Sequence, residues 1–409
     1  MRFSHFLIIL SLAVFWYGLI PMAGAFISRH GWRVFRRRFD DLRLKPFLDY
    51  ASCLDGAETG NVYRFIGSFE STDGSMLWIR SETLTMPVML EGAHTYILPM
   101  SEGDEILEGF DPRKEVPEKI QWDQVTVLTE GAKVFVGGSL VLKDDRRVFV
   151  STAEQPLLII FYDGNDRSLT IRTIRAGRNK NEYWNAVTPY AFIGGAFCQF
   201  MMALHFLSRP IFRFTVISAC IALFTPLVPL FPPGVLFTVL YRRLWLRARV
   251  FRSYRDILRL PLKYMPSGTW DCRLPDGERY GAVYYDALPG ASLGNNIPLL
   301  IPEKRGQRRP EQSKTALKKE GWYVFGRIPE GVSSGTPAPR ALSGEGLPEF
   351  PQEPRDLFAP FGAVLGNPEI LARTYTQKAY MLEILSCILL LAGLGLNIFL
   401  IIKILLVVF

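Results

Sequence analysis

The chain has 409 residues and a formal net charge of +8 at pH 7, and 49% of its residues are hydrophobic while 21% are charged. The apolar residues gather in a few long runs instead of recurring at the period of a surface helix or strand, which excludes an ordinary soluble globular protein and predicts a membrane protein. Five cysteines, three of them inside these runs, exclude a disulfide framework and a cysteine metal set.

Four apolar stretches approach the roughly 20 residues that a helix needs to cross the hydrocarbon core. They are residues 6–26, 187–207, 214–240 and 384–409. The third stretch is interrupted by Pro226, Pro229, Pro232 and Pro233. Because proline removes a helix donor, we predict one kinked pass there, or a pass followed by an interfacial segment. The sequence thus predicts a multi-pass α-helical membrane protein with about four spans, and three spans is the alternative.

Arginines cluster directly after the first and the third stretch. After the first stretch these are Arg29, Arg33, Arg36, Arg37 and Arg38, and after the third they are Arg242, Arg243, Arg247 and Arg249. Basic clusters that abut a span hold the loop on the cytoplasmic side and bind anionic headgroups. We therefore predict a protein of the cell (inner) membrane with cytoplasmic soluble domains, whose arginines contact the lipid bilayer and not nucleic acid.

The first apolar run is predicted to be a transmembrane anchor over residues 1–28, with its N-terminus outside. Only Arg2 precedes the run, whereas the arginine cluster follows it. The small residues of "MAGA" before Phe26 leave a cleavable signal peptide as the alternative.

The segment after the anchor carries apolar residues at helical spacing, namely Trp32, Phe35, Phe39 and Leu42. This spacing predicts an amphipathic helix on the bilayer surface, or a plain continuation of the anchor helix, which Pro46 should end.

Residues 29–186 are predicted to hold a soluble β-domain behind the basic segment. From Asn61 onward, β-branched and aromatic runs of strand length alternate with turn sequences such as "STDGS", "KDDRR" and "DGNDRS". The last run, "SLTIRTIRA", is predicted to be a strand like the others. The pattern indicates a compact antiparallel barrel or sandwich.

The run "GAKVFVGGSLVLKDDRRVFVST", residues 131–152, leads through a further strand pair into the apolar stretch at Val187. Residues 60–185 thereby resemble the membrane-side β-domain of the GIDE-type membrane ubiquitin ligases and their prokaryotic relatives. In those ligases a zinc-binding RING follows the last span. Here the chain after Tyr241 has only Cys272 and Cys387 and no histidine, so no RING is expected and only the domain type carries over.

The rest of the chain divides by composition. Residues 187–241 are predicted to form a transmembrane hairpin, and residues 242–302 a basic juxtamembrane segment with a small β module. Residues 303–366 are charged and rich in Pro and Gly, which predicts a flexible linker in which "WYVFGRI" adds one strand. Residues 367–409 are predicted to be a helix, capped by Asn367, that leads into the last span.

The sequence contains no complete catalytic motif. Two G-x-S-x-G matches, centred on Ser292 and Ser333, lack the strand before and the helix after that a nucleophile elbow needs, and no histidine follows His205. The other histidines, His5, His30 and His94, have no metal-ligand spacing. Asn397, inside the last apolar stretch, is predicted to hydrogen-bond across a helix pair. We predict no catalytic, cofactor or metal residue.

The expected function is that of a non-enzymatic integral membrane scaffold or partner-binding protein of the cell envelope. The alternatives are an accessory subunit of a membrane enzyme, such as a protease, and a small transporter or channel subunit. The protein partner is not identified by the sequence.

Overall fold

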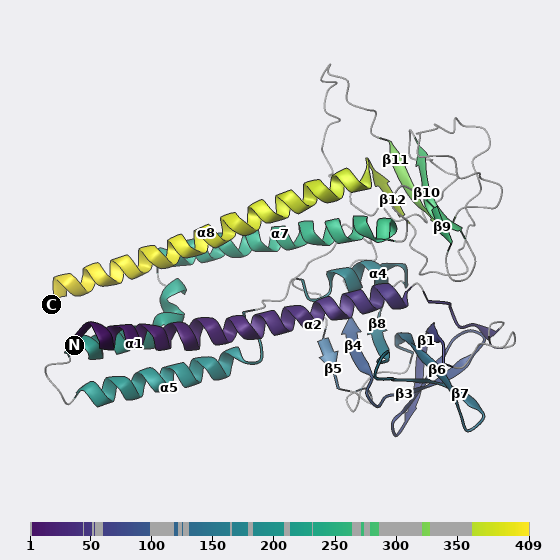
Figure 1. The fold of residues 1–409 in the computed structure, drawn as a ribbon, viewed down its shortest axis with the longest axis horizontal. Helices are drawn as coiled ribbons and strands as arrows, with labels where there is room; N and C mark the ends of the chain where they lie inside the picture. Colours follow the sequence, from purple (N-terminus) through teal and green to yellow (C-terminus); the bar gives the residue numbers. More distant parts are fainter. Residues whose placement is uncertain are drawn as a thin grey trace, which may run out of the picture. The chain divides into compact units, whose positions relative to one another are not determined.

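The computed structural model describes residues 2–43, 45–50, 53, 60–98, 118–121, 125, 131–163, 166–178, 183–207, 213–230, 232–263, 271–273, 279–285, 321–327 and 362–408 (Figure 1). These residues belong to two compact units. The helical unit comprises Met1–Val34, Asn179–Phe251 and Gln377–Phe409, and the β unit comprises Phe35–Arg178 and Arg252–Thr376. Each unit is described by itself below.

The β unit contains a closed five-stranded barrel. Its strands are β1 (Val62–Asp73), β2 (Met76–Arg80), β3 (Thr85–Met89), β6 (Lys133–Lys143) and β7 (Arg146–Val150). β1 pairs antiparallel with β2 and with β6, β2 with β3 and β6 with β7, while β3 and β7 are parallel, so the ring closes. This connectivity is that of an OB-fold barrel, and it confirms the predicted β-domain.

The barrel core is built by the alternation of apolar residues along its strands. Phe65, Leu77, Val88, Val136 and Phe149 are fully buried members of one apolar cluster. The β6–β7 hairpin turns at Asp144 and Asp145, both with positive φ, as a two-residue hairpin loop requires.

Three further strands extend the barrel sheet: β8 (Leu158–Tyr162), β4 (His94–Leu98) and β5 (Glu118–Ile120). β8 pairs antiparallel with the first half of β6, β4 pairs parallel with β8, and β5 pairs antiparallel with β4. One face of this extension, with Ile159 and Phe161, belongs to the barrel core. The opposite face is therefore left for another element to cover.

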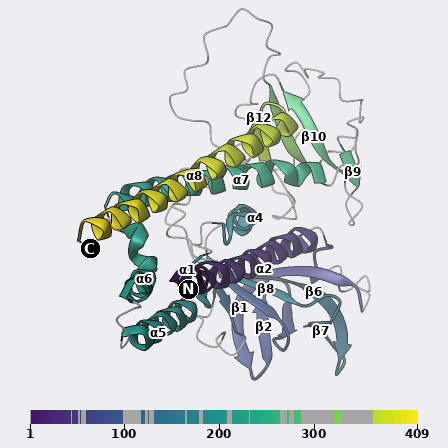
Figure 2. The same ribbon diagram turned by 60° about the vertical axis from the view of Figure 1, so that its left-hand side comes forward.

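Helix α2 (Ile20–Leu42) covers that opposite face with its last turns (Figures 1 and 2). The Phe35 ring lies 4.2 Å from the Tyr96 ring of β4, and the Phe39 ring lies 5.1 Å from the Phe135 ring of β6. Phe35, Phe39 and Leu42 are buried. The apolar face predicted from their spacing therefore packs on the sheet, and the helix continues the first apolar run instead of forming a separate surface helix.

Helix α4 (Asp166–Arg175) corrects the prediction of a strand at "SLTIRTIRA". Thr and Ile favour strands only weakly, and tertiary contacts override that preference. Here Leu169, Thr173 and Ile174 are buried on the helix, and Gly177 takes a positive φ just after its end.

A second sheet in the β unit has the order β12-β11-β10-β9, all antiparallel. Its strands are β9 (Asp271–Arg273), β10 (Arg279–Tyr285), β11 (Trp322–Arg327) and β12 (Gly362–Leu365). β11 and β12 come from residues 303–366, so the boundary predicted at residue 302 does not coincide with this small sheet. Most of the remaining predicted linker lies outside the described residues.

The helical unit contains α1 (Arg2–Val14), a π-helical turn η1 (Phe15–Leu19), α5 (Thr188–Leu207), α6 (Arg213–Leu223), a 3₁₀ segment η4 (Thr225–Leu230) and parts of α2, α7 (Gly234–Lys263) and α8 (Pro368–Val408). Three helical stretches are long and apolar enough to cross a membrane: Leu7–Leu42, Thr188–Leu207 and Pro368–Ile401. The anchor boundary predicted at residue 28 falls inside the first of them.

The predicted third span is divided in the structure. α6 ends at Leu223, η4 follows, and α7 begins at Gly234, so within the described residues this region offers no helix that meets the length and hydropathy of a span. The prolines at 226, 229, 232 and 233 explain the break, because each lacks a backbone donor. Four complete helical spans are therefore not present in the described structure.

Small residues let the first two apolar helices pack closely. A Cβ on Gly194 would lie 2.8 Å from the Trp16 ring, and one on Gly195 would lie 2.8 Å from the Tyr17 ring. The Tyr183 hydroxyl donates to the Tyr17 carbonyl in the π-helical turn. A backbone carbonyl in apolar surroundings is stabilised by such a donor.

We predict that Gly137→Ala destabilises the β unit. A Cβ at this position on β6 would lie 2.8 Å from Leu42 Cδ1 and 3.1 Å from Leu42 Cβ. Overpacking of this kind costs about 1–3 kcal/mol of unfolding free energy. Thermal unfolding in detergent measures the loss, and the control Gly31→Ala, with nothing within 4 Å of its new Cβ, should show none.

A double-mutant cycle with Leu42→Ala separates the contact with α2 from other causes. The cost of Gly137→Ala should shrink when Leu42 is truncated. An equal cost in both backgrounds would contradict the packing of α2 on β6.

Candidate functional site: an arginine-rich junction at the end of α4

The structure divides the arginines predicted to face lipid into exposed and enclosed groups. Arg33, Arg37, Arg242, Arg243 and Arg247 are exposed, Arg29, Arg36 and Arg38 are half-buried, and Arg249 is buried. The Arg249 guanidinium stacks on the Trp245 ring, 4.5 Å from its centroid. Part of the predicted cluster therefore has partners inside the protein, and α4 provides one of them.

The N-terminal end of α4 is fastened to the extended sheet. The Asp166 carboxylate lies 2.9 Å from Lys133 Nζ of β6 and accepts a hydrogen bond of 3.1 Å from the Tyr162 hydroxyl of β8. Burial, and after it the Asp166 charge, raises the pKa of Tyr162, so the hydroxyl stays protonated and keeps donating. An acidic residue in the first turn also suits the helix dipole.

Buried Arg172, in the last turn of α4, connects this helix to the same sheet. Its guanidinium donates to the carbonyls of Asp163 at 2.5 Å and of Leu98, the last residue of β4, at 2.8 Å. The arginine fork thus satisfies backbone acceptors at the ends of two strands.

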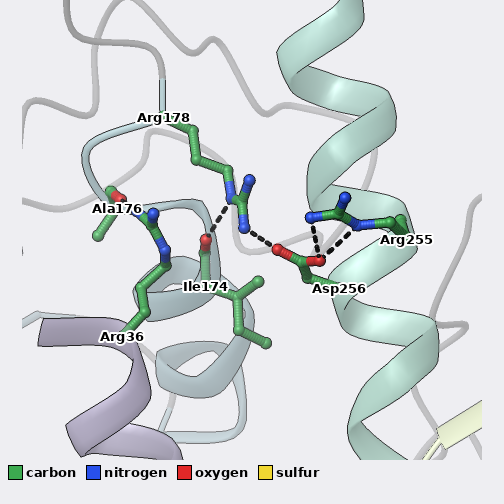
Figure 3. Close-up of polar contacts among 6 residues, drawn as sticks. All are labelled: Arg36, Ile174, Ala176, Arg178, Arg255 and Asp256. Carbon is green, nitrogen blue, oxygen red and sulfur yellow. Dashed lines mark hydrogen bonds and ion pairs between the residues drawn. The ribbon is translucent and has the colours of Figure 1, made fainter. Parts of the chain in front are cut away.

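Two other arginines reach the carbonyl end of α4 (Figure 3). Arg36 Nη1 of α2 donates to the Ala176 carbonyl at 2.6 Å, and Arg178 Nε donates to the Ile174 carbonyl at 2.9 Å. The last carbonyls of a helix have no N–H donor within the helix, and they carry partial negative charge. Cationic donors from two chain segments therefore meet at this helix end.

Asp256 of α7 brings a third segment to the junction (Figure 3). Its carboxylate forms an ion pair with Arg178 Nη2 and accepts from Arg255 Nε at 2.7 Å. Burial lowers the pKa of Arg178, the Asp256 charge opposes this, and the Arg255 charge adds to it. Arginine nevertheless remains charged, so Asp256 supplies the counter-charge for an almost fully buried cation.

Apolar contacts support the same junction. Ile171 and Ile174 of α4 pack with Ile257 of α7, and Tyr254 of α7 packs against this cluster. The Tyr254 ring also lies 5.6 Å from the Tyr375 ring of α8, in an edge-to-face arrangement. Within the β unit, α4 is therefore the element on which the ends of α2 and α7 converge.

The polar residues of the apolar helices bond to backbone groups. Asn397 Nδ2 of α8 donates to the Val228 carbonyl of η4 at 2.7 Å, and Gln199 Nε2 of α5 donates to the Ile9 carbonyl of α1 at 3.2 Å. The acceptor of Asn397 thus belongs to the broken segment, where helical bonds end.

The junction holds segments of the β unit together. Among the residues that the structure describes, no three His, Cys, Asp or Glu side chains are grouped to hold a metal ion. Ser292 and Ser333 lie outside the described residues.

Sequence reasoning missed α4 and therefore the junction. Two signals were present, since Asp166 stands in the first turn of the segment and Arg172 and Arg175 in the last, which is the charge order that a helix dipole favours. Arg178 and Asp256 are 78 positions apart in the sequence, and no local pattern connects them.

No protein-family model, curated protein or solved structure matches the chain.

We predict that Asp256→Asn destabilises the β unit. Arg178 would stay buried at the end of α4 without its counter-charge, and a lost charged partner costs about 1–3 kcal/mol. Denaturant unfolding of the detergent-solubilised protein measures the change, and the control Arg259→Gln alters an exposed charge on the same helix.

Replacing both partners, Arg178→Met with Asp256→Leu, should recover much of the lost stability, because neither charge then remains buried alone. If Asp256→Asn and Arg259→Gln behave alike, the ion pair does not secure the junction.

Proposed function

We propose that the chain is a non-enzymatic, multi-pass integral membrane scaffold that presents the barrel domain and the small sheet to a protein partner on the cytoplasmic side of the cell membrane. The observation that carries the proposal is the packing of α2. The helix that bears the first apolar run ends inside the β unit, with Phe35, Phe39 and Leu42 buried. The chain between the apolar run and the barrel is therefore helical, which suits a scaffold.

The distribution of exposed side chains along α2 supports a membrane boundary. Phe26 and Ile27 are exposed apolar residues, and exposed Arg33 and Arg37 follow Phe26 on the same helical face. Apolar residues that give way to arginines on one face are typical of a helix that leaves the hydrocarbon on the cytoplasmic side.

Helix α7 shows the same change in the same chain direction. Exposed Leu236 and Leu240 are followed on one face by exposed Arg243 and Arg247. Exposed Tyr183, Trp184 and Tyr190 around the start of α5 fit an aromatic belt. These features support a common boundary near Phe26, Trp184 and Leu240.

In the proposal, α6, η4 and the start of α7 together make the third of four passes. Irregular backbone at membrane depth must have its polar groups satisfied by protein. The hydrogen bond from Asn397 to the Val228 carbonyl supplies one such partner. The bonds of Asn397 and Gln199 to backbone carbonyls favour a structural role for these residues over a transport pathway.

Kinship with the β-domain of GIDE-type ligases is also part of the proposal, for this domain alone. The closed barrel at residues 62–150 followed by an apolar helix from Thr188 supports it. An accessory subunit of a membrane enzyme would use the same architecture. The two functions differ only in whether the bound partner is an enzyme.

We predict opposite accessibility for two single cysteines, each placed in a chain whose five native cysteines are replaced by serine. Lys143→Cys lies at the exposed end of β6, and Lys403→Cys lies near the end of α8. A membrane-impermeant maleimide should label Lys403→Cys in intact cells and Lys143→Cys only after the membrane is opened. Labelling of Lys143→Cys from outside would contradict a cytoplasmic barrel domain.

A further inference from the structure

A cationic cluster lies on the β unit, away from the junction at α4. Tyr96 of β4 stands at its centre, with the Phe35 ring of α2 against it. Lys119 of β5 is directly opposite Tyr96 in the strand register, so both side chains stand on the same face. His94, two residues before Tyr96, points to that face as well.

Arg38 of α2 completes the cluster. It follows Phe35 by three positions, which places it on the side of the helix that meets Tyr96. Burial raises the pKa of Tyr96, and the Arg38 charge opposes this rise, in keeping with their proximity. Three groups that carry or accept positive charge therefore lie on the face of the sheet that holds Tyr96.

The cluster lacks a counter-charge within the described part of the chain. Arg38, His94 and Lys119 make no ion pair there, while Glu118 alternates to the other face of β5. Burial lowers the pKa of His94, and the charges of Lys119 and Arg38 lower it further. Burial and both charges thus favour the neutral imidazole of His94.

We propose that Arg38, His94 and Lys119 form a binding site for a phosphoryl group. A phosphate monoester carries close to two negative charges at pH 7, which match Arg38 and Lys119, and its oxygens accept from the planar arginine fork. His94 provides a further donor and takes up a proton when the anion binds. Lys119 is exposed, so the site is open to solvent, and Arg38 and His94 are half-buried, so it has a fixed inner wall.

The ligand chemistry has two sources, a lipid headgroup and a soluble phosphate compound. Both bring the same phosphoryl oxygens. The test therefore uses the full chain in phosphatidylcholine nanodiscs, with inorganic phosphate added to solution in one arm and phosphatidic acid added to the bilayer in the other.

The measured quantity is the pH titration of the His94 imidazole by NMR of histidine-labelled protein. The chain has four histidines, and His94→Gln identifies the signal. Either phosphate source should raise the pKa of His94, because a bound anion favours the imidazolium. A rise with inorganic phosphate assigns a soluble ligand, and a rise with phosphatidic acid alone assigns a lipid.

Substitutions of exposed Lys119 and half-buried Arg38 test whether this cluster binds the phosphoryl group. Lys119→Gln, on an exposed residue that no fold contact requires, should weaken binding by about tenfold, as loss of one charge-assisted contact does. Arg38→Gln should weaken it at least as much, and Lys143→Gln, an exposed lysine elsewhere on the sheet, should leave it unchanged.

Sulfate keeps its charge between pH 6 and 8, so any change of its affinity with pH comes from titration of the protein. It should bind more tightly at pH 6 than at pH 8, since the bound state carries the extra proton on His94. The proposal is overturned if neither phosphate source moves the His94 titration, or if Lys143→Gln weakens binding as much as Lys119→Gln.

Discussion

The packing of the last turns of α2 on the extended sheet is the contact on which the rest of the structure depends. Three side chains, Phe35, Phe39 and Leu42, fill the face of β4 and β6 that the barrel core does not use. Gly137 is needed on β6 because a Cβ there would meet Leu42. The helical stretch Leu7–Leu42 is therefore apolar enough to cross a membrane in its first part, and its last turns form a layer of the β unit.

Several arginines of this chain bond to backbone carbonyls inside the protein. Arg36, Arg172 and Arg178 donate to backbone carbonyls, and two of them satisfy the end of α4, where the helix leaves its acceptors open. Asp256 provides charge for Arg178 from a distant part of the sequence. A count of positive charges near the apolar stretches therefore overestimates the number of exposed arginines, since Arg33 and Arg37 are exposed and Arg36 is half-buried.

The spacing of the apolar residues and the residue types at the turns predicted much of the fold. The strands of the barrel, the charged hairpin at Asp144 and Asp145, and Asn367 as the cap of α8, whose Oδ1 accepts from the Glu369 amide at 2.9 Å, all follow from local sequence. The failures have tertiary causes. The run "SLTIRTIRA" is helical because its contacts with the sheet and with α7 decide its state, and β12 joins the small sheet through pairing with distant β11. The cluster of Arg38, His94 and Lys119 depends on strand register and helix packing, neither of which a single sequence displays.

Hydrogen–deuterium exchange of the full chain in nanodiscs tests the central claim most directly. If the end of α2 is a layer of the β unit, the amides of residues 35–42 open only when the domain unfolds, and their protection should equal that of β6. Exchange of residues 35–42 that is orders of magnitude faster than that of β6 would show a helix end that frays independently of the barrel, and would contradict the account.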